Sequence, residues 1–115
     1  MEIIRKSSES INPMEFYKMT QNPKNISLKD TEDITINIVS WVVYSDINAS
    51  GNEVELISII DDQGLVYVTN SKTFRDSFIK AVDFFEQNNS SFSVIKVIHG
   101  KSKAGRNYID CEIVG

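Results

Sequence analysis

Cysteine and histidine are nearly absent from this sequence, which contains one of each, Cys111 and His99. A single cysteine cannot form an intrachain disulfide, and such sparse use fits a reducing cytoplasm. Together the two side chains could supply at most two nitrogen or sulfur ligands, whereas a structural zinc site usually has four protein ligands. We therefore expect no metal and no other cofactor. Cys111 alternates with Ile109 and Ile113, which favours a place in the core.

Long hydrophobic runs are also missing. No stretch approaches the roughly 20 apolar residues that a membrane-spanning helix needs. The first ten residues are mixed in charge and polar after Ile4, unlike a secretory signal peptide. The sequence therefore predicts a cytoplasmic protein with no membrane partner.

Catalytic motifs are not recognisable either. Gly100-Lys101-Ser102 copies the end of a phosphate-binding P-loop, but Ile95 stands where that motif needs its first glycine, and a strand is expected where it needs a helix. A nucleophilic pair of Cys111 and His99 would need orienting and oxyanion-binding groups that no motif marks. We therefore expect a protein that is not an enzyme and has no catalytic residues.

Positive charge is scarce overall, because the formal net charge is −4, yet it is unevenly distributed. The segment 94–108 contains no acidic residue. A basic segment on an acidic body can still concentrate a polyanion locally. The basic residues of this segment are Lys96, Lys101, Lys103 and Arg106, with His99 among them.

Two parts of the chain differ in their expected organisation. Residues 1–10 read as a flexible arm, and residues 11–115 read as one folded domain. A short helix should open this domain, because Asn12 can cap it and Pro13 is favoured in a first turn. The residues expected to dock this helix are Met14, Tyr17 and Phe16.

The remaining chain predicts five strands and a longer helix. Alternation and turn signals place the strands at 34–44, 53–60, 65–69, 92–98 and 106–114, with a loop at 99–105. Asn70 or Ser71 can cap the helix after the third strand. Its apolar stripe at helical spacing is Phe74, Phe78, Val82 and Phe85.

The first of these strands contains a phase slip. Apolar alternation runs through Ile34, Ile36 and Ile38 and then resumes one residue early, at Val39, Trp41 and Val43. A bulge produces such a slip and lets a strand bend around a barrel corner. The order of three strands, a helix and two strands is that of the mainly β, five-stranded OB-type barrel. A half-open sheet with a helix on one face would give the same order, but the slip favours the barrel.

An OB barrel binds oligonucleotides on its first three strands and in the loops after strands one and four. The second of these loops carries Lys101, Lys103 and Arg106, spaced by Gly100 and Gly105, and we expect its cations, with Lys96, to contact phosphates. Single strands also stack their bases on aromatic side chains. Tyr108 shares the outward set of its strand, Tyr67 could point either way, and Trp41 continues an apolar alternation that favours burial. The candidate stacking residues are Tyr108, Tyr67, Trp41 and Tyr44.

Four short motifs resemble one protein family over residues 12–114. They are Asn12–Lys18, Ser40–Asp46 followed by Gly51 and Glu53, Val68–Ser71 with Thr73 and Phe74, and Ser102–Arg106. They are similar to those of small single-stranded-DNA-binding proteins from phages and mobile elements of Gram-positive bacteria. The resemblance implies an OB-fold protein that coats and protects unpaired DNA during phage replication or recombination, in the host cytoplasm.

Two hypotheses of function follow. The first is sequence-tolerant binding of single-stranded DNA, with replication or recombination proteins as further partners. The alternative is a protein-interaction module on the same barrel, such as an inhibitor of a host enzyme, which the acidic net charge supports. A homo-oligomer is the expectation if the apolar strand residues Val42, Ile57 and Ile59 exceed what one barrel can bury.

Overall fold

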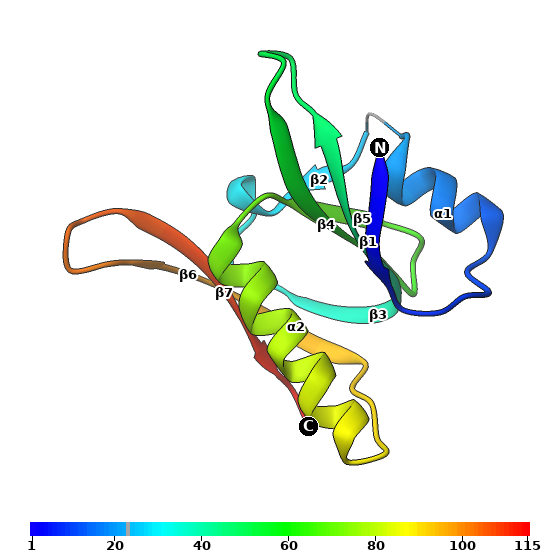
Figure 1. Cartoon of the computed structure of the whole chain (residues 1–115). Helices are drawn as coiled ribbons and strands as arrows, with labels where there is room; N and C mark the ends of the chain where they lie inside the picture. The colour runs from blue at the N-terminus through cyan, green and yellow to red at the C-terminus, as the bar shows by residue number, and fades with distance from the viewer. Residues whose placement is uncertain (23) are drawn as a thin grey trace.

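A strongly curved sheet of mostly antiparallel strands carries two α-helices and makes up most of the structure (Figure 1). The computed structural model describes residues 1–22 and 24–115. The result is a small mixed α/β domain in which strands dominate. In chain order the elements are β1 (Glu2–Lys6), α1 (Pro13–Thr20), β2 (Ile26–Ser27), the 3-10 helix η1 (Leu28–Asp30), β3 (Thr35–Ile47), β4 (Glu53–Asp61), β5 (Val66–Thr69), α2 (Lys72–Gln87), β6 (Val94–Lys101) and β7 (Asn107–Ile113).

The strand order depends on the long connection through α2, which joins β5 to β6. The strands lie in the order β2-β5-β4-β3-β6-β7, with β1 paired to β3 beside this path. Strands β3, β4 and β5 form a meander, and α2 then carries the chain back so that β6 lies antiparallel beside β3. Three meander strands and a fourth returning beside the first make a Greek key. The predicted order of three strands, a helix and two strands is confirmed.

The sheet curls into a half-barrel, so a barrel-like β fold is confirmed, but backbone pairing does not close it. In the described part of the chain, β5 pairs with β4 and β2, and no ladder joins it to β7. The register between β3 and β4 shifts between Ile38 and Ser40, which confirms the predicted bulge. Val39 was expected to point into the core. It is instead 49% exposed, because the extra residue of a bulge falls outside the alternation.

The inner face of the sheet is filled by the apolar stripe of α2. Phe74, Phe78 and Val82 are buried as predicted. The Phe78 ring lies edge-on to Trp41, with ring centroids 5.2 Å apart. Phe85 is half-buried and packs against Phe92. This inner core consists of Leu28, Ile36, Trp41, Val43, Ile57, Ile59, Phe74, Phe78, Val82, Ile95, Val97 and Ile109.

The outer face of β3, β4 and β5 is covered in part by α1. Asn12 caps this helix as predicted, because its Oδ1 accepts from the backbone N–H groups of Met14 and Glu15. The docking prediction holds for half-buried Phe16 but is wrong for Met14 and Tyr17, which are 62% and 55% exposed. Their side chains turn away because Met19 faces the sheet instead. The buried residues of this outer core are Met19, Val42, Tyr44, Ile60 and Val66.

The first residues are not a free arm. Glu2–Lys6 forms β1, which pairs with β3, so the expectation of a flexible arm over residues 1–10 is corrected. Arg5 also reaches α2, where its guanidinium contacts Asp83 at 2.7 Å and Glu86 at 3.1 Å. Glu2–Lys6 is held against the sheet because β3 is long. One edge of β3 pairs with β6 near the start of β3 and with β1 further along.

The apolar residues that suggested an oligomer are all used within one chain. Val42, Ile57 and Ile59 are each at most 1% exposed. The outer helix covers Val42, and the inner core includes Ile57 and Ile59. These three positions therefore leave no apolar surface for a second copy to cover.

Candidate functional site

The hairpin of β6 and β7 projects from the body of the domain (Figure 1). Its ladder continues through the pairs His99–Ile109, Gly100–Tyr108 and Lys101–Asn107. The predicted loop at 99–105 is therefore too long at its start: the loop is Ser102–Arg106. Neither the glycine nor the histidine breaks the ladder, and His99 thereby becomes a strand residue with a fixed direction.

The loop itself is a tight turn built around one glycine. The Ser102 N–H donates to the Arg106 carbonyl, and the Gly105 N–H donates to the Ser102 carbonyl, both at 2.9 Å. Gly105 has a φ of +78°, which an L side chain rarely adopts. This is the three-residue hairpin geometry in which a type I turn precedes a residue in the left-handed region. The turn places Lys103 between the flanking cations Lys101 and Arg106.

The cations of this turn make no ion pair within the described part of the chain. Lys101, Lys103 and Arg106 are all exposed, whereas Arg5, Lys6, Lys72 and Arg75 engage carboxylates. Between His99 and Tyr108 the hairpin carries no acidic residue. Its positive charge is therefore fully directed to solvent, where it can attract a polyanion.

Lys96 lies apart from this cationic turn. It is exposed on the same strand, but its cross-strand neighbour is Glu112, near the base of the hairpin. An adjacent carboxylate offsets its charge, so the structure does not join Lys96 to the group at the tip.

Tyr108 is the one predicted stacking residue in the described chain that is exposed rather than buried or half-buried. Its side chain is 39% exposed, next to the cationic turn. It lies over Gly100 on the neighbouring strand: a Cβ at position 100 would come within 2.6 Å of the tip of the ring. The glycine thus gives the ring a flat backbone surface to rest on. A ring held in this way is pre-oriented for stacking.

The other three predicted stacking residues are corrected by the structure. Trp41 is 8% exposed and lies in the inner core under α2, as its apolar alternation favoured, and Tyr44 is 4% exposed in the outer core under α1. Tyr67 is half-buried against the inner core, and its hydroxyl donates to Asp61 at 3.2 Å. Burial raises the pKa of the Tyr67 phenol. None of the three can stack on a base without leaving its contacts.

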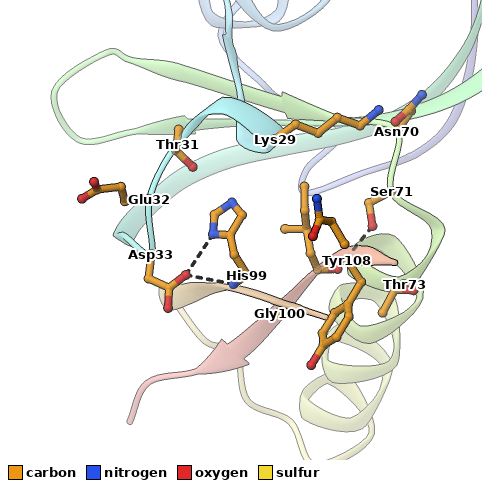
Figure 2. Close-up of a pocket in the computed structure, with 12 residues that line it drawn as sticks. Lys29, Thr31, Glu32, Asp33, Asn70, Ser71, Thr73, His99, Gly100 and Tyr108 are labelled. Atoms are coloured by element: carbon orange, nitrogen blue, oxygen red, sulfur yellow. Dashed lines mark hydrogen bonds and ion pairs between the residues drawn. The ribbon is translucent and has the colours of Figure 1, made fainter. Parts of the chain in front are cut away.

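A pocket of about 790 Å³ opens beside Tyr108, at the gap where the half-barrel is not closed (Figure 2). Its walls come from three places: η1 and the residues after it, the start of α2, and the hairpin. Lys29 and Asn70 line one side, and Tyr108 with Asn107 lines the other. The pocket is therefore continuous with the hairpin surface that carries the unpaired cations.

His99, on one wall of this pocket, contacts two other segments through its two ring nitrogens. Nδ1 lies 2.9 Å from Oδ1 of Asp33, and Nε2 lies 2.8 Å from the carbonyl oxygen of Leu28 (Figure 2 shows the first contact). The His99 backbone N–H also donates to Oδ1 of Asp33, at 2.8 Å. A carbonyl and an ionised carboxylate only accept hydrogen bonds, so both contacts are satisfied together only by the doubly protonated imidazolium.

The protonation of this pair follows from its contacts. The hydrogen bonds to the Leu28 carbonyl and to Asp33 raise the pKa of His99 above its ordinary value of 6.5. The hydrogen bonds from His99 lower the pKa of Asp33. Cys111, by contrast, is mostly buried, and burial raises the pKa of its thiol to about 12. The placement predicted for Cys111 is confirmed by its packing against the inner core.

The hairpin between β3 and β4 differs in charge from that between β6 and β7. Asp46, Glu53 and Glu55 flank its tip, where the loop after the first predicted strand was expected to help bind an oligonucleotide. Glu2 of β1 pairs beside it. These carboxylates would repel an anionic ligand, and α1 covers the outer face of the sheet. The structure therefore does not support the first three predicted strands as a surface for binding an oligonucleotide. The candidate site is therefore limited to the β6–β7 hairpin and the pocket.

Two residues of this site were missed by the sequence analysis. Lys29 stands in a polar run with no motif, and His99 was considered as a metal ligand, as half of a nucleophilic pair and as part of the basic segment, but not as a link between segments. Lys29 and His99 are separated by 70 positions, and only the return of β6 beside β3 brings their segments together. No local pattern in the sequence signals this contact.

Residues 1–22 and 24–115 contain neither a cluster of metal-ligating side chains nor a helix that could span a membrane. No group of three or more histidine, cysteine, aspartate or glutamate side chains is placed to hold a metal. Neither α-helix in that part of the chain has the length and apolar character needed to cross a bilayer. No protein-family model matches the chain, and no match was found among curated proteins or among solved structures.

Proposed function

We propose that this protein binds single-stranded DNA with little sequence preference, along the β6–β7 hairpin and into the adjoining pocket. The observation that carries the proposal is the unpaired cationic turn of Lys101, Lys103 and Arg106 next to the exposed ring of Tyr108. Flexible single strands are bound by cations that follow the backbone and by aromatic rings that stack on bases.

The direction of the bound strand follows from the charges around the hairpin. Asp110 and Glu112 lie towards the base of β7, so the phosphates would be repelled there. Lys29, on the far wall of the pocket, offers a further exposed cation. We infer a path from the turn, past Tyr108, and across the mouth of the pocket towards Lys29. Such a path gives about four phosphate contacts and one stacked base.

We also infer that the fold is of the OB type. The Greek-key order β5-β4-β3-β6-β7, with α2 between β5 and β6, supports this inference, as does the bend at the bulge in β3. An OB barrel is partly open, and oligonucleotides meet the loop between its last two strands. In this chain that loop is the cationic turn. The proposed role is to coat and protect unpaired DNA in phage replication or recombination.

Binding is tested by titrating the protein against dye-labelled oligo-dT and following fluorescence anisotropy. The reporter must be on the DNA, because buried Trp41 is shielded from the proposed site. We expect saturable binding to the single strand and much weaker binding to a duplex of equal length. Tyr108→Phe should bind as the natural protein does, whereas Tyr108→Ala should lose about 1–3 kcal/mol, the contribution of one stacked base. Equal binding of all three proteins, or no binding at low salt, would refute the proposal.

A second candidate function is supported by the acidic hairpin tip. Ile47 is 60% exposed there, between Asp46 and Glu53. An exposed apolar side chain among carboxylates fits a module that binds a basic protein, such as a host enzyme that it inhibits. This candidate predicts that substitutions in the β6–β7 turn leave the interaction intact and that substitutions at the acidic tip abolish it.

A further inference from the structure

We propose that protonated His99 is a positioning residue for DNA binding: it latches the β6–β7 hairpin across the pocket, so that single-strand affinity depends on its proton. This inference rests on the proposed function, because the bound strand is taken to be single-stranded DNA. It goes further by assigning a role to a residue that touches no phosphate in the proposed path and by adding a pH dependence.

The latch is a set of three contacts that converge on one residue. The ring and the backbone N–H of His99 share Oδ1 of Asp33, and the opposite edge of the ring meets the Leu28 carbonyl. The contacts with Asp33 extend the pairing of β6 with β3, whose last backbone bond joins the Val97 N–H to the Ile34 carbonyl. The contact with the Leu28 carbonyl joins β6 to η1, on the opposite wall of the pocket. The last two ladder pairs of the hairpin and its turn follow directly after His99, so contacts at this residue help to set their direction.

Loss of the proton breaks one contact of the latch in either tautomer. If Nδ1 loses it, a ring lone pair faces the Asp33 carboxylate at 2.9 Å. If Nε2 loses it, the lone pair faces the Leu28 carbonyl oxygen at 2.8 Å. Both arrangements place two acceptors against each other, which is unfavourable. We therefore expect the neutral form to release the hairpin from at least one wall of the pocket.

The charge of the pocket changes with the same proton. The titratable and charged groups that line the pocket around His99 are Lys29 from η1, Glu32 and Asp33 from the segment after it, and Tyr108 from β7, whereas the start of α2 contributes only the uncharged Asn70, Ser71 and Thr73. Lys96 of β6 lies outside the lining but acts on Asp33 by its charge. Among the groups that line the pocket, the positive charges of protonated His99 and Lys29 balance the negative charges of Glu32 and Asp33. With neutral His99 the carboxylates outweigh Lys29, and an approaching phosphate is repelled. Positioning and electrostatics therefore act in the same direction.

The direction in which the latch changes with pH follows from the linkage between protonation and folding. Because the folded protein raises the pKa of His99, the latch contributes fully below the ordinary value of 6.5 and is lost as the pH rises through the raised value. Asp33 has a lowered pKa, so its contribution is lost only as the pH falls below its ordinary value of 3.8. The latch is thus complete in mildly acidic solution and weakens as the pH rises through the raised pKa of His99.

The experiment combines an NMR titration with binding measurements on the full chain. Because His99 is the only histidine, its imidazole C–H signals report its pKa without ambiguity. We expect a raised pKa in the free protein and a further rise with oligo-dT bound. Reciprocity then requires the affinity for oligo-dT to fall as the pH increases, by about tenfold for each unit by which DNA raises the pKa.

Two variants separate positioning from general structure. Asp33→Asn keeps an oxygen for the His99 N–H but removes the charge, so both the pKa and the midpoint of the affinity profile should move to lower pH. Asp30→Asn makes the same charge change on η1, outside the pocket lining, and should leave the midpoint in place. His99→Gln should bind oligo-dT with an affinity that does not change over the pH range in which His99 of the natural protein titrates.

The outcomes distinguish this inference from the proposed function. Binding that is independent of pH in the natural protein, or equal midpoints for Asp33→Asn and Asp30→Asn, overturns the role of His99 and leaves DNA binding standing. Absence of binding at every pH overturns both.

Discussion

Reversing the charge of the turn, in the variant Lys101→Glu/Lys103→Glu/Arg106→Glu, should reduce affinity for oligo-dT about a hundredfold or more. Exposed ion pairs contribute up to about 1 kcal/mol each, and reversal adds repulsion to their loss. All three side chains are exposed and outside the core, so the fold should be unaffected. The variant therefore tests the site and not the stability of the domain. Fluorescence anisotropy at low salt measures the effect.

The salt dependence gives the same prediction a second readout. Each phosphate contact to a single strand contributes about −0.7 to the slope of log affinity against log salt concentration, so four contacts give roughly −3. The triple variant should retain a slope of roughly −0.7 or less steep.

A matched control carries the same change in net charge elsewhere. Lys24 and Lys80 are exposed, Lys18 is partly exposed, and all three lie outside the hairpin and the pocket. Their reversal to glutamate should change affinity only through the long-range field, which salt screens. If both triple variants lose the same affinity at 0.15 M salt, binding depends on net charge and the hairpin is not the site.

The largest effect on stability is expected for Phe78→Ala. Phe78 is fully buried at the centre of the inner core, and its ring meets Trp41, Phe74 and Phe92. Removing a buried phenylalanine ring costs about 3–5 kcal/mol, because transfer free energy is lost and a cavity remains. Small domains have only about 5–15 kcal/mol of stability in total. In urea unfolding followed by Trp41 fluorescence, the variant should have its midpoint at or below the urea concentration at which the natural protein begins to unfold.

Phe84→Ala is the matched control on the same helix. Phe84 is 61% exposed, so its removal should change stability by about 0.5 kcal/mol or less. A similar cost for both variants would mean that α2 packs on the sheet through a different face from the one described.

Local patterns in the sequence predicted most elements of the fold. The stripe of α2 and the cap at Asn12 depend on neighbours within one or two turns, and such signals can be read directly. The bulge was visible because apolar alternation changed phase inside β3. The three hairpin turns also share a pattern that begins with a polar side chain and has glycine three residues later: Asn48–Asn52, Asp61–Leu65 and Ser102–Arg106.

What could not be predicted depends on contacts between distant segments. Alternation alone does not distinguish a strand residue under a helix from one facing solvent, so Tyr44 was assigned to the site although it is buried. Trp41 was kept as a candidate although its alternation favoured the burial that the structure shows. β1 was missed because its partner lies about 40 positions away. The bridge from His99 to Asp33 and Leu28 has no sequence signature for the same reason.

The candidate site was predicted only in part. The exposed cations of the turn and Tyr108 were identified from charge and alternation, and the structure places them together on one hairpin. The contribution of the first three strands was not supported, because α1 and an acidic tip occupy the surfaces concerned.

The central claim is that an unpaired strand lies along the β6–β7 hairpin and the pocket beside it. Amide chemical-shift mapping of the labelled full chain during titration with oligo-dT tests this most directly. We predict shift changes concentrated in residues 99–108 and 28–33. Changes concentrated at residues 45–55 or on α1, with the hairpin unchanged at saturation, would contradict it.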